Sequence, residues 1–172
     1  MAIYALGDRV PTVHPDAYVH PDATIIGLVE IGSEATIWAG AVLRGDYGRI
    51  VVGARTSVQD GTVVHATHEL DTIIGADCVI GHNAHLEGCT IEPHSLVGSG
   101  SIVLHRVKVG PHALVGANAV VTNGTQVPPH AMALGIPATI KENAVHDGSF
   151  GPAVALYVAN GKRYKSELRR ID

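Results

Sequence analysis

A branched aliphatic residue returns at almost every sixth position of this chain, and a small residue usually follows four places after it. A period of six is neither the 3.6 residues of a helix nor the 2 of a flat strand. It is typical of a chain that coils around an axis with one flat side for each hexapeptide. We therefore predict an all-β solenoid in which the aliphatic residues point inward and stack turn upon turn. These residues are Val13, Val19, Ile25, Ile31, Ile37, Leu43, Val52, Val58, Val64, Ile74, Ile80, Leu86, Ile91, Val97, Val103, Val109, Val115, Val121 and Val127.

The pattern divides the chain into two predicted parts. Residues 1–139 form the coil, and residues 1–12 are a short lead-in before the first repeat. Residues 140–172 form a connecting loop and a C-terminal helix, because the apolar residues of 152–170 follow helical spacing and Pro152 suits a first helical turn. A helix packed along the outside of the coil would cover exposed sheet.

Two interruptions break the count of six. The sequence DYGRIV separates Leu43 from Val52 and predicts a short bulge, whereas ATHELDTI separates Val64 from Ile74 and predicts a protruding loop. Inserted residues of this kind add no side to the coil, so the repeats before and after them stay in register.

Composition narrows the classes of function. The 172 residues fit one domain with a sizeable core. The formal net charge of −4 argues against general nucleic-acid binding, and no apolar stretch is long enough to cross a bilayer. The N-terminus lacks the basic and apolar segments of a secretory signal, and Cys78 and Cys89 are best explained as small buried residues in a reducing cytoplasm. We therefore expect a cytoplasmic protein with no nucleic-acid or membrane partner.

A three-sided coil stacks residues that lie three repeats apart, which predicts columns of side chains. Leu43, Val64 and Leu86 then share one side, and the residues that follow them are Arg44, His65 and Glu87. Neighbouring members of this column should be separated by roughly the 4.8 Å between adjacent strands.

A second column holds Asp60 and His82, each two residues after an inward aliphatic of the preceding side, and Gln59 lies beside it. His65 and His82 therefore belong to different sides of one coil. They could meet only if another subunit packed alongside, as in a cyclic trimer. Two imidazoles and the Glu87 carboxylate would then form a recognised ligand set for Zn²⁺ or Fe²⁺, with an open position for water. The alternative is that both histidines form hydrogen bonds across an ordinary interface.

At these residues the sequence resembles a known family. The runs IWAGAVLRGDYGRIVVGARTSVQDGTVVH and TIIGADCVIGHNAHLEGCTI, closed by LGIPA, are similar to the gamma-class carbonic anhydrases, in particular their small carbonic-anhydrase-like or ferripyochelin-binding-like branch. The resemblance covers about the whole chain. It implies a left-handed parallel β-helix with a C-terminal α-helix, a homotrimer, a zinc or iron ion between subunits, and reversible hydration of CO2 to bicarbonate.

The resemblance also implies the metal ligands. His65, in VVH, matches the first ligand of the family, and His82, in IGH, matches the ligand that an adjacent subunit supplies. The third ligand of the family is a histidine, and this chain has Glu87 there.

Five further residues match the family around this set. Arg44 and Asp46, in RGD, correspond to an ion pair at the trimer interface. Gln59 corresponds to the residue that orients metal-bound water, and Asp60 to the partner of the arginine. Tyr157 lies where this branch places a tyrosine near the site.

Glu87 leaves the metal site open to several interpretations. As a ligand, its charge would raise the pKa of bound water relative to three neutral histidines. Alternatively, His85 or His68 supplies the third nitrogen and Glu87 orients it. We expect alternation along the strand to keep His85 on the face away from Glu87 or at the corner. A third possibility is that metal binds poorly. In an active hydratase, His68 or Glu69 could carry the released proton to buffer.

Two other functions compete with CO2 hydration. Many hexapeptide-repeat proteins transfer acyl groups from coenzyme A and use one histidine as a general base in a cleft between subunits, although the loops here are short for enclosing that cofactor. The chain could also be a trimeric binding protein, related to metals or siderophores, that catalyses nothing.

Overall fold

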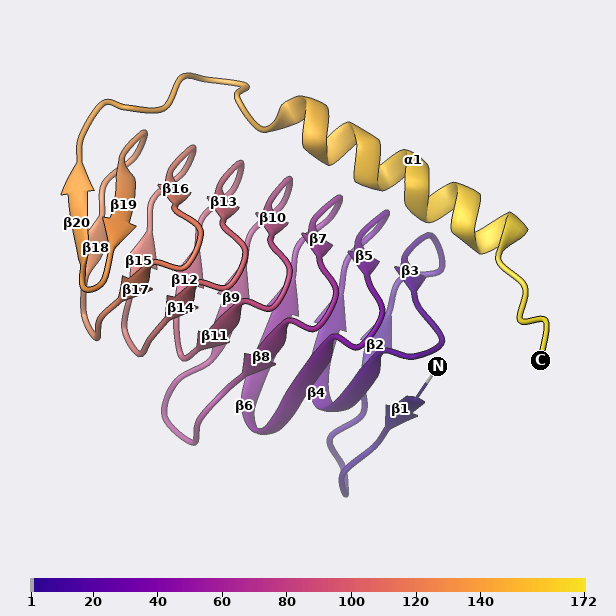
Figure 1. Ribbon diagram of the computed structural model, residues 1–172. Helices are drawn as coiled ribbons and strands as arrows, with labels where there is room; N and C mark the ends of the chain where they lie inside the picture. The colour runs from indigo at the N-terminus through magenta and orange to yellow at the C-terminus, as the bar shows by residue number, and fades with distance from the viewer. Residues whose placement is uncertain (1) are drawn as a thin grey trace.

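In the computed structural model, which describes residues 2–172, the chain winds around one axis and its strands form three flat faces (Figure 1). Two strands, β4 (Thr24–Ile31) and β6 (Val42–Val52), are long enough to turn a corner, so that their first and second halves belong to different faces. The first half of β6 pairs with β8 (Val63–His65), and the second half pairs with β9 (Thr72–Ile74). All strand pairings are parallel except that of the last two strands of the described chain, and the architecture is that of the left-handed parallel β-helix, as the sequence predicts.

Each face is a ladder of short strands. The first face contains β1 (Ala2–Tyr4), β4 (Thr24–Ile31), β6 (Val42–Val52), β8 (Val63–His65), β11 (His85–Glu87), β14 (Ile102–Val103) and β17 (Val120–Val121). The second adds, to the far halves of β4 and β6, β2 (Thr12–Val13), β9 (Thr72–Ile74), β12 (Thr90–Ile91), β15 (Lys108–Val109) and β18 (Gln126–Val127). The third contains β3 (Tyr18–Val19), β5 (Thr36–Ile37), β7 (Ser57–Val58), β10 (Val79–Ile80), β13 (Leu96–Val97), β16 (Leu114–Val115), β19 (Met132–Gly135) and β20 (Ala138–Lys141).

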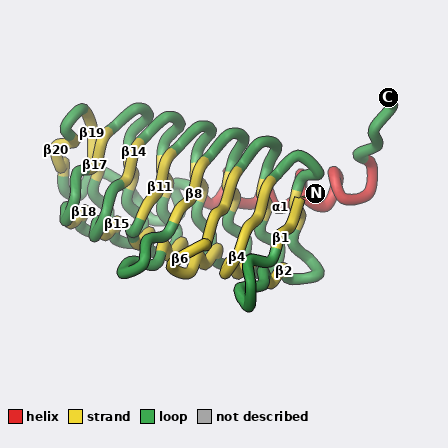
Figure 2. Tube along the Cα trace, turned by 90° about the horizontal axis from the view of Figure 1, so that it is seen from below, coloured by secondary structure: helices red, strands yellow, loops and turns green. Residues whose placement is uncertain are grey.

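The aliphatic repeat forms the core. Ile25, Leu43 and Leu86 are completely buried, and the alanines that follow the repeat positions, such as Ala23 and Ala84, fill the narrower corners. Because each inward side chain packs on its equivalents in the neighbouring turns, the period of six seen in the sequence becomes one continuous apolar column. The stacked turns are visible from below in Figure 2.

The structure refines the ends of the coil. Part of the predicted lead-in is strand, because β1 pairs in parallel with β4 and so adds a rung to the first face. At the other end, β20 runs antiparallel to β19 and continues to Lys141, two residues beyond the expected boundary at 139.

The bulge predicted at DYGRIV corresponds to a register shift between β4 and β6. There Gly27 has a φ of +76°, and a Cβ on it would lie 2.3 Å from the Gly45 carbonyl oxygen. The close approach of the two backbones therefore requires glycine at this corner.

The C-terminal helix α1 (Gly151–Glu167) lies along the third face (Figure 1). Val154 and Val158 pack on Val79, and Gly161 lets the helix approach, since a Cβ there would lie 2.6 Å from Thr36 Cγ2. No helix within residues 2–172 is long and apolar enough to cross a membrane.

Candidate active site

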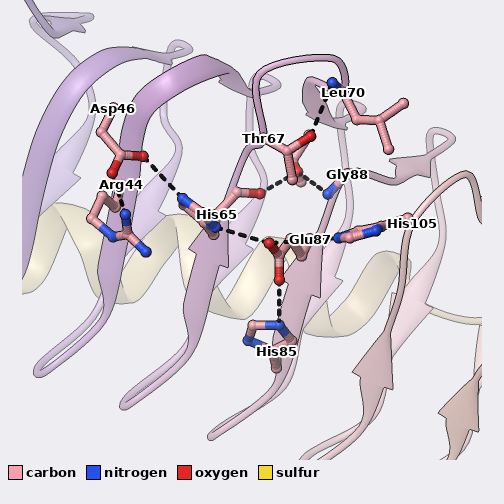
Figure 3. Close-up of polar contacts among 10 residues, drawn as sticks. Arg44, Asp46, His65, Thr67, Leu70, His85, Glu87, Gly88 and His105 are labelled. Carbon is pink, nitrogen blue, oxygen red and sulfur yellow. Dashed lines mark hydrogen bonds and ion pairs between the residues drawn. The ribbon is translucent and has the colours of Figure 1, made fainter.

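The column predicted from the repeat is present on the first face. β6, β8 and β11 pair in register, so that Arg44 lies beside His65 and His65 lies beside Glu87 (Figure 3). Each side chain comes from the same position in successive turns, one residue after a buried aliphatic. Stacking of the turns therefore creates this cluster without any irregular backbone.

His65 lies between two carboxylates. Its Nε2 is 2.9 Å from Asp46 Oδ1 and its Nδ1 is 3.0 Å from Glu87 Oε1, and the side chain is only 15 % exposed. Asp46 also pairs with Arg44. Burial pushes the pKa of Asp46 upward, but hydrogen bonds from His65 and Arg44 outweigh it and hold the pKa below its ordinary value. Both ring nitrogens of His65 are thus engaged within the chain.

Glu87 accepts contacts from three imidazoles (Figure 3). Besides His65, His85 Nε2 lies 3.3 Å from Oε2, and His105 Nε2 lies 3.5 Å from Oε1. Burial raises the pKa of Glu87, yet the hydrogen bonds from these histidines are stronger in sum and lower the pKa overall. The carboxylate is therefore ionised and held by its own chain.

The expectation that His85 would point away from Glu87 is wrong. Successive side chains of a strand alternate between its faces, so residues two apart lie on the same face. His85 and Glu87 are two apart in β11 and their side chains meet. His105 was not foreseen. It belongs to the following turn, one residue beyond Leu104, which is the position equivalent to Glu87, and its ring leans back to the carboxylate.

The second column is also present, but it is open to solvent. His82 Nδ1 lies 2.8 Å from Asp60 Oδ2, and the two side chains are 48 % and 50 % exposed. Within the chain Asp60 therefore pairs with His82, and Asp46 is the residue that pairs with Arg44. The neighbouring Gln59 is buried. With Nδ1 bound to the carboxylate, His82 keeps Nε2 available for a substrate, a metal or a partner.

His65 and His82 extend from different faces, as predicted, and no contact joins them. Across residues 2–172, no three His, Cys, Asp or Glu side chains are arranged to hold a metal ion. Of the predicted ligands, His65 and Glu87 lie on the first face, and His82 lies in the turn after β10. His82 has a carboxylate on one ring nitrogen, as a metal-binding histidine usually does, whereas His65 has a carboxylate on each.

The loop after β8 directs its side chains elsewhere. His68 packs against Tyr47 with ring centroids 3.9 Å apart, and Glu69 is exposed and lies 3.7 Å from Arg106. The Glu87 carboxylate contacts His65, His85 and His105, so His68 takes no part in this cluster. The roles of His68 and Glu69 as proton carriers stay predictions.

Tyr157 belongs to an aromatic cluster beneath α1. Its ring centroid is 6.1 Å from that of Trp38, which in turn packs on Tyr164 and donates hydrogen bonds to Thr36 and Ser57. In this chain Tyr157 therefore helps to seat the helix, and its predicted role near a site between subunits is untested.

Both cysteines are buried, as predicted. Burial raises the pKa of the Cys78 thiol and that of the Cys89 thiol to about 12, so neither is a nucleophile at neutral pH.

Several known proteins are similar to this chain in sequence and in fold. The bacterial transferase hexapeptide family, defined by six repeats, matches residues 71–103 and 88–123. The carnitine operon protein CaiE of Escherichia coli K12 is 39% identical over 147 residues, which are 86% of this chain and 75% of CaiE.

Two solved structures cover nearly the whole chain. A hexapeptide transferase family protein from Anaplasma phagocytophilum is 34% identical and superposes with a TM-score of 0.90, over 95% of this chain and 98% of that one. A Bacillus cereus protein named as a candidate acetyltransferase is 31% identical, with a TM-score of 0.94 over 97% of this chain and 98% of that one.

Proposed function

Because the chain belongs to the family of hexapeptide-repeat proteins that includes the carnitine operon protein CaiE, we propose that it transfers acyl groups from a coenzyme A thioester. The observation that carries this proposal is the Asp60–His82 pair, with 2.8 Å between Oδ2 and Nδ1. Support also comes from the names of its relatives, which include a hexapeptide transferase and a candidate acetyltransferase.

His82 has the properties of a general base. Asp60 accepts a hydrogen bond from Nδ1–H, which fixes the tautomer that leaves Nε2 unprotonated. Nε2 would remove the proton from an acceptor amine or hydroxyl as that group attacks the thioester carbonyl. When the C–S bond breaks, the proton passes from the imidazolium to the departing thiolate. The products are the acylated acceptor and free coenzyme A.

His65 is less suited to this role. Both of its nitrogens already face carboxylates, and its side chain is 15 % exposed against 48 % for His82. A base must reach the proton that it abstracts, and of these two histidines only His82 offers an unoccupied nitrogen on an open surface.

We expect the working enzyme to be a homotrimer, because His82 is exposed on one chain and a cleft for a large substrate needs a second wall. The first face carries a strip suited to such packing, in which Val63 and Ile102 are exposed on either side of His85. Exposed apolar residues in register on a flat sheet favour contact with another chain.

The test is release of free thiol from acetyl-CoA, with and without a panel of amine and hydroxyl acceptors. The His82→Asn variant should lose activity by about 10²–10⁴-fold, which is the usual contribution of a general base. His14→Asn is a matched control, because His14 is 46 % exposed and lies 3.7 Å from Asp16. Wild-type protein that neither binds nor turns over acetyl-CoA, or full activity in His82→Asn, would overturn the proposal.

A second candidate is reversible CO2 hydration at a metal between subunits, favoured by the carboxylate on each of the two histidines. His65, Glu87 and the partner subunit's His82 would be the ligands of Zn²⁺ or Fe²⁺. When bound, such an ion would activate water for attack on CO2. Gln59 would orient that water, and the Arg44–Asp46 pair would hold His65 in place.

Glu87 distinguishes the two functions. Hydration requires Glu87 and His65 as ligands, whereas acyl transfer by Asp60 and His82 does not. The Glu87→Gln variant should therefore lose bound metal and any CO2 hydration, measured by stopped-flow pH change, and keep thiol release. Bound zinc or iron with neither activity would instead support a non-catalytic binding protein.

A further inference from the structure

One corner of the coil carries a column of ionisable residues that the proposed function does not use. All six have positive φ, between 55° and 63°, and they occupy the same position in successive turns. The first three form ion pairs in sequence, with Arg55 Nη1 3.6 Å from Glu34 and Nε 2.8 Å from Asp77. The last three are histidines. The column is Glu34, Arg55, Asp77, His94, His112 and His130.

The three histidines form a stack. Their ring centroids are 4.9 Å apart for His94 and His112 and 5.0 Å apart for His112 and His130, with interplanar angles of 15° and 3°. Each follows a proline, at Pro93, Pro111 and Pro129, so the sequence repeats the same dipeptide every eighteen residues. The fold thereby aligns three groups that can gain a proton near neutral pH.

The segment that connects the coil to α1 crosses this stack. We call residues 142–150 the arm. The amides of Ala144 and Val145 donate hydrogen bonds to the His130 carbonyl, at 2.8 and 2.9 Å. Asp147 Oδ1 lies 3.7 Å from His112 Nδ1 and 3.7 Å from His130 Nε2. A single carboxylate of the arm therefore faces two imidazoles of the coil.

The protonation state of His130 decides whether that approach is favourable. Its Nδ1 lies 3.2 Å from the Val145 carbonyl, so Nδ1–H is the donor in that bond. In the neutral ring, Nε2 then carries a lone pair directed toward the Asp147 carboxylate. In the imidazolium, Nε2 carries a proton and the two groups attract.

We propose that His112, His130 and Asp147 form a pH-dependent clasp, which holds the arm more tightly to the coil as the pH falls through the range in which histidine gains a proton. The Asp147 carboxylate attracts a charged imidazolium and not a neutral ring, so protonation of His112 or His130 favours closure of the arm.

The surrounding charges limit the clasp to one proton. Asp147 is the one carboxylate within 4 Å of His112 or His130 in residues 2–172, and rings 5.0 Å apart oppose a second positive charge. On the other side of His94, Asp77 is already paired with Arg55. The start of α1, around Phe150 and Val154, adds only uncharged groups to the small cavity of about 80 Å³ beside His94 and His112.

Glu142 and His146 are the other titratable residues of the arm, and neither makes an ion pair within the part of the chain that the structure describes. The pH dependence is therefore assigned to Asp147 and the two histidines. Because the arm leads directly into α1, the clasp also controls how firmly the start of that helix is held on the third face (Figure 1).

The test is amide hydrogen exchange of residues 142–150, corrected for intrinsic rates, at about pH 8 and about pH 5.5. In the wild type, local opening should be about two- to fivefold rarer at the lower pH, as expected for an exposed ion pair. Asp147→Asn should remove this difference, and it should fold normally because Asp147 is 83 % exposed. His130→Gln should remove it as well.

Asp22→Asn is the matched control, because Asp22 is exposed and lies 3.8 Å from His20 but joins no second segment. It should leave the pH dependence of the arm unchanged. Equal pH dependence in the wild type and in Asp147→Asn would overturn the proposal.

Discussion

His65 and His82 each contact a carboxylate through one ring nitrogen, but the surroundings of the other nitrogen differ. Each has a carboxylate on one ring nitrogen, Asp46 for His65 and Asp60 for His82. The second nitrogen of His65 faces Glu87, whereas the second nitrogen of His82 faces solvent. The difference arises from one extra acidic residue, Glu87, whose carboxylate contacts the second nitrogen of His65.

A carboxylate partner and a free ring nitrogen are therefore two separate properties of a histidine. A buttressing carboxylate makes an imidazole a better base or ligand, but only an unoccupied nitrogen can act. Glu87 and the histidines around it contact one another within one chain, while the Asp60–His82 pair leaves one imidazole nitrogen free for a group from outside. The most informative substitutions are those that remove or increase this difference between His65 and His82.

The largest effect is expected from disrupting the surface through which His65 of one chain and His82 of another would meet. Val63→Glu places a charge on the first face, next to His85 and in line with Ile102. We expect the mass in solution, measured by light scattering after gel filtration, to fall to about one third, because a charge buried at an interface without a partner is strongly unfavourable. Val10→Glu, at another exposed apolar position, should leave the mass unchanged. A wild type that is already monomeric would contradict the trimer.

The next largest effect is expected from weakening the hydrogen bond between His82 and Asp60. Asp60→Asn keeps the shape of the pair but removes the charge that fixes the tautomer of His82. We expect thiol release from acetyl-CoA to fall about 10–100-fold, the usual cost of losing a residue that orients a functional histidine. Asp46→Asn, which weakens the support of His65, should change this activity much less.

A smaller effect is expected when Glu87 is replaced by the histidine that gamma-class carbonic anhydrases, which the sequence resembles, have at this position. Glu87→His removes the carboxylate from His65 Nδ1 and supplies a neutral nitrogen instead. Zinc affinity should rise by about tenfold, or about 1.4 kcal/mol, and CO2 hydration should increase with it. Metal analysis of the purified protein and stopped-flow hydration assays measure both. No change in either would show that position 87 is not a ligand position.

The smallest effect concerns stability. The pKa of Glu87 is lowered in the folded protein, so its ionised form stabilises the fold above the ordinary value of 4.5, and this contribution is lost as the pH falls below that value. Glu87→Gln should therefore lower the free energy of unfolding by about 1–2 kcal/mol near neutral pH, and this difference should shrink in acid, at about pH 3. Urea unfolding at the two pH values measures it.

Glu92→Gln is the control for that experiment. Glu92 pairs with Lys108 on the surface at 2.9 Å, and a single exposed ion pair contributes about 0–1 kcal/mol. A loss in Glu87→Gln that is equally large at both pH values would show that shape, and not charge, is the source of the stabilisation.

The sequence predicts most of the fold because one rule, an inward aliphatic at every sixth residue, determines which residues stack. From that rule alone, Arg44, His65 and Glu87 fall into one column, and Asp60 and His82 into another, as the structure has them. The clasp residues follow the same rule, since His112 and His130 lie eighteen residues apart.

Features that depend on side-chain direction or on departures from the repeat are harder to predict. The predicted position of His85 was wrong because residues two apart along a strand point to the same face. His105 was missed because the count places it just beyond the stacked strand, where a side chain can lean back toward the previous turn. β1 was missed because the lead-in lacks the repeat, although the exposed edge of β4 binds it.

The antiparallel hairpin of β19 and β20 also affects whether further strands can add to the end of the coil. A parallel ladder with an open end is a template on which further strands can add, one rung at a time, toward a fibre. On the third face the terminal strand is β20, which runs against every other strand of that sheet. A further parallel rung would meet it in the wrong direction, so on this face the hairpin acts as a stop to polymerisation.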